Sequence, residues 1–155
     1  MGMGKLARGI NGEYKKTYKP LIAWLIGYSL ISIIIIRAID RLSSLTKKMS
    51  VKTSALFYLI FTVISLYILM LIIYKGEYIY WINGGPNFKQ AQRMTSGERK
   101  EYAGKHLAIF SKVMLVTFLY GFISLILVLP FWLDVILITL FVVIAGFSTM
   151  WIRFD

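Results

Sequence analysis

The sequence predicts an all-α integral membrane protein that crosses the bilayer four times. Two observations support this prediction. First, 58% of the 155 residues are hydrophobic and the mean hydropathy is +0.70, whereas a soluble domain of this size needs a more polar surface. Second, charged residues make up only 16% of the chain, and most of them lie between apolar runs that are long enough to span a bilayer as helices. In lipid, a helix satisfies its own backbone hydrogen bonds, which an open strand does not do.

Composition also narrows the classes of function. The chain has no cysteine, which excludes disulfides, thiolate metal sites and a cysteine nucleophile. The single histidine, His106, does not form a multi-histidine metal site by itself. The net charge of +11 does not favour nucleic acid as a partner, because the cations flank apolar runs and do not line one soluble face. They favour contact with the anionic headgroups of the lipid bilayer. We expect no cofactor and no metal.

The first predicted span covers residues 20–37. Pro20 suits the first turn of a helix, where its missing N–H has no partner to lose, and Arg37 is expected to end the span. Residues 37–52 are then expected to form a short basic link. Hydroxyl side chains in this link suit a turn with a new helix N-cap, namely Ser43, Ser44, Thr46 and Ser50.

The basic tail before the first span, residues 1–19, has two readings. It is a solvated tail, or it is an anchor on the lipid surface in which Tyr14 and Tyr18 assist the lysines.

The second span covers residues 54–74, and the longest polar segment of the chain, residues 75–106, follows it. Aromatic side chains at this junction are typical of a membrane interface, namely Tyr74, Tyr78, Tyr80 and Trp81. The sequence Asn-Gly-Gly-Pro at 83–86 predicts a turn. Thr95 and Glu98 have the spacing of a capping box. They predict a short amphipathic helix that begins there and runs on into the third span.

The third span covers residues 107–128 and the fourth covers 131–152, with a tight hairpin predicted at Leu129-Pro130. Small or hydroxyl side chains lie on one face of the third span, at a spacing that suits close helix packing or a pore lining. They are Thr117, Gly121 and Ser124. No long linker divides the chain, so we expect residues 1–155 to form a single transmembrane domain.

The distribution of cations predicts the orientation. With four spans, the tail, the segment 75–106 and the C-terminus lie on one side and hold twelve of the 18 lysines and arginines. The link between the first two spans holds five. Because positive loops face the cytoplasm, we expect a multi-pass protein of the cell membrane with both termini and the segment 75–106 in the cytoplasm.

Two ionisable residues fall within the predicted spans, Lys112 and Asp134. Antiparallel helices would hold them roughly 20 Å apart at 1.5 Å rise per residue, so we expect no direct salt bridge between them. Lys112 suits a lysine that reaches the interface along its stem, and Asp134 suits the interface itself. Ion passage or a partner contact stays open for both. Glu98 and Glu101 are expected on a solvated helix face, and no nucleophile with a base is evident.

A set of residues from the turn into the third span matches a known pattern. The turn contributes Trp81, Ile82, Gly84 and Asn87, and the helix contributes Ser96, Glu98, Arg99, Tyr102, Lys105, Leu107 and Phe110. In this pattern the stretch 55–153 resembles a family of small bacterial multi-span membrane proteins of unknown function. In that family a Gly-Tyr-Asn-Thr turn precedes a Ser-x-x-Glu-Lys helix, whereas here Gly85-Pro86-Asn87 replaces the turn. The short spans around a basic, aromatic-edged loop also resemble immunity proteins that protect bacteria from membrane-acting peptide toxins.

These observations favour a non-enzymatic membrane protein of accessory or immunity type, which binds another membrane component or a toxin. We expect its contacts at Gly84, Asn87, Ser96, Glu98, Tyr102 and Lys105. The alternative is a subunit of a small channel or transporter, in which copies of this chain associate and Asp134 lies on the path. A membrane enzyme ranks last, because its acid–base groups would have to come from Glu98, Glu101 and His106 alone.

Overall fold

The computed structural model describes residues 14–46 and 50–152, and its architecture is helical. The elements are α2 (Lys19–Thr46), α3 (Val51–Gly76), the 3-10 turn η1 (Ile79–Trp81), α4 (Phe88–Arg93), α5 (Ser96–Leu127) and α6 (Phe131–Met150). Within the described ranges, four helices, α2, α3, α5 and α6, are long and apolar enough to cross a membrane. The predicted fold class is confirmed, and the chain is a small multi-pass membrane protein. Predictions for residues 1–13, Lys47, Lys48 and Arg153 lie outside the described residues.

Helix α2 is longer than the sequence indicated. It runs through Arg37 to Thr46, so the predicted end at Arg37 and the predicted link over residues 37–52 were wrong. An arginine ends an apolar run, but it is a good helix former and does not end a helix. Between Arg37 and Thr46 the chain has no glycine or proline, and the helix continues until the short connection to α3.

Helix α3 begins and ends at clear signals. The Ser50 hydroxyl accepts a hydrogen bond from the Thr53 N–H at 3.1 Å, which makes it the N-cap among the hydroxyl residues that the sequence suggested. At the other end Glu77 takes the left-handed conformation at φ 58°, and the Tyr78 N–H reaches back to the Ile73 carbonyl at 3.0 Å. The left-handed residue followed by this backward hydrogen bond is a Schellman ending, in which glycine is the usual left-handed residue.

The polar segment between α3 and α5 is folded. Asn87 and Gln90 form a capping box at the start of α4, and Thr95 and Glu98 form a second one at the start of α5. The helix predicted to begin at Thr95 is the first part of α5, which continues without a break into the span. A separate amphipathic helix in this segment is therefore not evident beyond the six residues of α4.

Helices α5 and α6 form a hairpin at the predicted position. Val128 ends α5 in the left-handed conformation at φ 50°, and Pro130 precedes the first turn of α6. The Leu129 N–H donates to the Ser124 carbonyl at 3.2 Å, which repeats the Schellman ending of α3 with a β-branched residue where glycine is usual.

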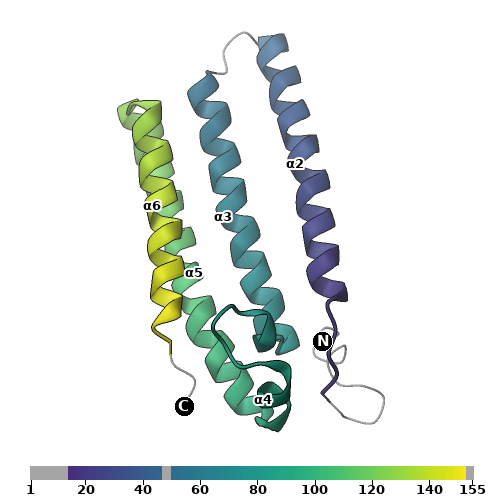
Figure 1. Ribbon diagram of the computed structural model, residues 1–155. Coiled ribbons are helices and arrows are strands. Elements are labelled where there is room, and N and C mark those ends of the chain that lie inside the picture. The colour runs from purple at the N-terminus through teal and green to yellow at the C-terminus, as the bar shows by residue number, and fades with distance from the viewer. Residues whose placement is uncertain (1–13, 47–49, 153–155) are drawn as a thin grey trace.

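Helix α3 is the central element of the bundle. It contacts α2, α5 and α6, and most extensively α5. Helix α2 stands on the far side of α3 from α5 and α6 (Figure 1) and packs mainly against α3. The start of α2, the end of α6 and the segment with α4 lie at one end of the bundle, and the α5–α6 hairpin lies at the other.

Close packing between α3 and α5 depends on Gly121. A Cβ at this position would lie 2.9 Å from the Ile60 Cδ1 of α3, a separation at which one of the two helices or the Ile60 side chain has to shift. Thr117 and Ser124, one turn on either side, are fully buried. The predicted small-residue face of the third span is thus a helix contact.

We predict that Gly121→Leu lowers the free energy of unfolding by about 1–3 kcal/mol, because it overpacks the contact between α3 and α5. Gly27→Leu is the matched control: a Cβ at Gly27 meets no atom within 4 Å, and both changes raise helix propensity alike. Unfolding in mixed micelles measures the difference. Equal stability of the two variants would contradict this role of Gly121.

Candidate functional site

A buried ion pair joins the end of α3 to the start of α5. Glu77 and Arg99 are both buried, at 7% and 6% exposure. The Arg99 Nε donates to Oε2 of Glu77 at 2.8 Å, and Nη2 lies 2.8 Å from the same oxygen. Ser96 donates its hydroxyl to Oε1 at 2.5 Å. Because the carboxylate lies at the N-terminus of α5, the helix dipole also stabilises its charge.

The remaining N–H donors of Arg99 bind backbone carbonyls of the segment between α3 and α5. Nη1 donates to the carbonyl of Ala91 at 3.1 Å and to the carbonyl of Met94. One guanidinium therefore binds the end of α3 and the connection between α4 and α5 at once. Lys100 adds a weaker, exposed contact, with its Nζ 3.9 Å from Oε1 of Glu77.

The chain before α2 docks on the same cluster. The Tyr14 ring lies over the Arg99 guanidinium, with Cζ 4.2 Å from the ring centroid, and the Tyr14 hydroxyl donates to the backbone carbonyl of Glu77. Thr17 is fixed by Tyr80, whose hydroxyl donates to the Thr17 carbonyl at 2.7 Å, and by the Trp81 indole N–H at 3.1 Å. Tyr14, Thr17 and Tyr18 thus pack against the loop, while Lys15 and Lys16 are exposed, so residues 14–18 are not a freely solvated tail.

Burial keeps these tyrosines in the hydrogen-bonding form. It raises the pKa of Tyr14 and of Tyr80 above the ordinary value for a phenol, since a phenolate would lose its hydration. Both hydroxyls therefore remain donors at every physiological pH. We refer to the segment 77–95 together with residues 14–18 and 96–99 as the cap.

The six predicted contact residues occupy different environments in the cap and in the next two turns of α5. Asn87 and Glu98 are exposed and serve as partners in the two capping boxes, and Ser96 donates to Glu77. Tyr102 is buried, Gly84 supplies the left-handed turn at φ 76°, and Lys105 pairs with Glu101 at 3.0 Å on an exposed face. Because Tyr102 is buried, the six residues do not all lie on an exposed surface.

A second buried charge lies at the opposite end of the bundle. Asp134, in the first turn of α6, has 0% exposure. Its Oδ1 accepts from the Tyr120 hydroxyl at 2.8 Å and from the Ser124 hydroxyl at 2.5 Å. Lys52, at the start of α3, places Nζ 3.8 Å from Oδ2 and donates to the Ser124 carbonyl at 3.0 Å. These contacts close the bundle where α3, α5 and α6 meet.

Neither ion pair was found from the sequence. No bridge between Asp134 and Lys112 was expected, and Lys112 is exposed. The partner of Asp134 is Lys52, which is far in sequence and was expected in a link. Glu77 directly follows α3, beside the aromatic residues of the interface. A signal was available, since a lone acid directly after a span needs a partner if it is buried.

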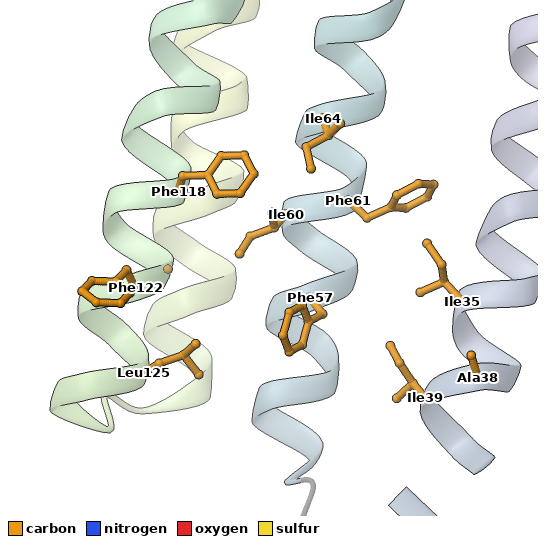
Figure 2. Close-up of a pocket in the computed structure, with 11 residues that line it drawn as sticks. Ile35, Ala38, Ile39, Phe57, Ile60, Phe61, Ile64, Phe118, Phe122 and Leu125 are labelled. Carbon is orange, nitrogen blue, oxygen red and sulfur yellow. The ribbon is translucent and has the colours of Figure 1, made fainter. Parts of the chain in front are cut away.

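An apolar groove opens between α2 and α5, with α3 as its floor. Figure 2 shows side chains from all three helices around it. Its volume is about 640 Å³. It is lined by Ile35, Ala38, Ile39, Phe57, Ile60, Phe61, Ile64, Phe118, Gly121, Phe122 and Leu125. None of these described lining residues has a charged or hydrogen-bonding side chain.

Helix α2 forms one wall of the groove and is fixed to α3 nearer the cap. The Trp24 indole N–H donates to the Ser65 carbonyl at 3.1 Å, and the hydroxyls of Tyr28 and Thr62 are 3.4 Å apart. Tyr28 also stacks on Phe61. Farther along, the Tyr58 side chain of α3 makes polar contacts with Tyr28 and Ser32 of α2, whereas the residues of α2 and α3 that line the groove are apolar.

Comparisons with protein-family models, with curated proteins and with solved structures gave no match to this chain.

We predict that Arg99→Met frees the cap, because it leaves the Glu77 carboxylate buried without its counter-ion, at a cost of about 3–5 kcal/mol. Trypsin should then cut faster after Lys89 and Arg93, which are both exposed on α4. The helical circular dichroism signal of the spans should remain unchanged. Lys105→Met, which removes an exposed cation from the same helix, is the control. If both variants are cut at the native rate, Arg99 does not hold the cap.

Proposed function

We propose that this protein is a non-enzymatic membrane protein that binds an apolar helix of another polypeptide in the groove between α2 and α5. The groove is the observation that supports this proposal. The buried acids of the described chain, Glu77 and Asp134, are engaged in contacts between its own helices, which favours structural roles for them. The groove, in contrast, has no internal occupant.

The lining of the groove favours a helix as its occupant. Helix-in-groove recognition places apolar side chains of one helix between those of two others. Phe57 and Phe61 on the floor and Phe118 and Phe122 on the α5 wall provide large apolar contacts, and none of the described lining residues is polar enough to hold a ligand headgroup. Because α2 packs mainly against α3, a shift of α2 relative to α5 would widen the groove for an incoming helix.

The occupant determines which version of the function holds. A helix of a resident membrane protein would make this chain an accessory subunit. A membrane-acting peptide toxin would make it an immunity protein, as the resemblance of its layout implies. We also propose that the cap faces the cytoplasm of a bacterial cell, since the positive side of the chain includes it. There, exposed Lys75, Lys89 and Arg93 would lie near anionic lipid headgroups.

Site-specific photo-crosslinking in cells tests the groove. With p-benzoylphenylalanine in place of Phe122, we expect an adduct with a polypeptide of defined mass, and none with the same group at Leu140, which is exposed on α6. The polypeptide is then identified and tested for binding to the purified protein. Lipid adducts alone at Phe122 would contradict the proposal.

Two alanines of α2 provide the matched control. Ala38 lines the groove and Ala23 does not, and both are exposed. Ala38→Trp should fill the groove and abolish the polypeptide adduct, whereas Ala23→Trp should leave it. If the partner is a toxin, Ala38→Trp should also remove the protection of cells challenged with that peptide. An adduct that persists in Ala38→Trp would contradict the proposed binding mode.

A second candidate function is a subunit of a channel or transporter, and Asp134 is the observation that favours it. A fully buried carboxylate within a span is costly and often marks an ion path. Its Oδ2 accepts no hydrogen bond from the described residues, and the Lys52 ammonium lies 3.8 Å away from it. Thr117, two turns away from Ser124 on the same helix face, is also buried without a hydrogen-bond partner in the described chain.

Flux measurements in liposomes test this second candidate. If it holds, the reconstituted protein carries a monovalent-cation current, and Asp134→Asn reduces this current by roughly a factor of ten or more, since it removes the charge at the binding point. Asp40→Asn, at an exposed acid of α2, should leave the current unchanged. Absence of current in the native protein eliminates the candidate.

A further inference from the structure

The single histidine of the chain lines a cavity at the cap end of the bundle. The cavity has a volume of about 450 Å³ and is lined by residues of α3, η1, α5 and α6 and by Leu21 at the start of α2. Trp81 and Asn83 line it on the side of the cap, and Phe110, Val143 and Gly146 line it within the spans. It is separate from the groove between α2 and α5, so an inference about it is independent of the proposed function.

The contacts of His106 determine which of its nitrogens carries the proton. Nδ1 lies 3.0 Å from the backbone carbonyl oxygen of Tyr102. A carbonyl only accepts, so Nδ1 is the protonated nitrogen. A neutral imidazole has one N–H, and Nε2 therefore presents a lone pair that accepts a hydrogen bond.

Nε2 has no hydrogen-bond partner among residues 14–46 and 50–152. The side chain is nearly fully buried, at 1% exposure. Buried polar atoms in proteins are nearly always paired, and an unpaired one is unfavourable. Because His106 is one of the residues that line the cavity, a donor held in the cavity can reach Nε2 once the ring turns toward it.

We propose that the cavity binds a neutral membrane lipid with a free hydroxyl group, and that this hydroxyl donates a hydrogen bond to Nε2 of His106. None of the described residues that line the cavity is charged, which disfavours a charged headgroup. Phe110 and Val143 provide an apolar path for the hydrocarbon chain along the spans. Asn83, at the cap end, is placed to meet the more polar end of the molecule. The binding needs a small shift of the ring, because Nε2 is closed off from solvent in the unliganded protein.

The imidazole ¹⁵N spectrum tests this proposal on the native protein. Because the chain has one histidine, ¹⁵N-histidine labelling gives signals from His106 alone. The probes are oleyl alcohol and its methyl ether, which share the chain but differ in the donor. In micelles of a detergent without hydroxyl groups, we expect oleyl alcohol to shift the Nε2 signal and to bind roughly ten times more tightly than the ether, since only it pairs the buried acceptor.

Two glycine variants provide controls. Gly146 lines the cavity and a Cβ there meets no atom within 4 Å, so Gly146→Leu should fill the cavity and abolish the shift. Gly27→Leu places the same side chain in open space on α2 and should leave the shift unchanged. Circular dichroism verifies that both variants are folded.

Three results would overturn the proposal. An Nε2 signal that oleyl alcohol does not move excludes the hydrogen bond. An equal shift with the ether excludes a role for the donor. A shift that persists in Gly146→Leu places the alcohol elsewhere. Because the first two comparisons use the native chain, they stand even if Gly146→Leu fails to fold.

Discussion

The contact between the Glu77 carboxylate and the Arg99 guanidinium is the interaction on which the cap depends. It lies where α3 ends and α5 begins, and one side chain, Arg99, touches the helix end, the loop carbonyls and the Tyr14 ring. A buried pair of this kind adds little net stability over a well-packed apolar pair, but loss of one partner is costly. It therefore acts mainly to select one arrangement of the cap. Ser96 and the two capping boxes then complete the hydrogen bonding around it.

The same design recurs at the other end of the bundle. Asp134 binds two hydroxyls of α5, and Lys52 binds both Asp134 and the last-turn carbonyl of Ser124. In each cluster an acid at one helix terminus forms an ion pair with a cation from another helix. The cation also donates hydrogen bonds to backbone carbonyl groups. Between the two clusters the contacts of α3 with α5 and α6 are largely apolar. This separation leaves α2, which has weaker polar ties to α3, as the adjustable part of the bundle and as one wall of the groove.

Sequence reasoning succeeded where a signal is local and failed where it is not. Apolar run length gave the four long helices, Thr95 and Glu98 gave the start of α5, and Leu129-Pro130 gave the hairpin, because each depends on neighbouring residues. The ion pairs join residues 22 and 82 positions apart, which no local pattern encodes. The end of α2 was misplaced because a charge was taken as a helix stop. The groove and the cavity at His106 arise from the relative placement of three or four helices, and no residue pattern identifies either of them.

The contacts of Tyr14 bear on the order in which the protein assembles. Its hydroxyl donates a hydrogen bond to the carbonyl of Glu77, 63 residues later in the chain, and its ring contacts the guanidinium of Arg99. During synthesis the first two helices must therefore already have entered the bilayer, and the residues up to Arg99 must have left the ribosome, before this docking is complete. At about 5–20 residues per second, the leading segment stays undocked for seconds. The same contact requires Tyr14 and the cap to lie on one side of the membrane. It therefore forms only when the hairpin of α2 and α3 is inserted with both of its ends on that side.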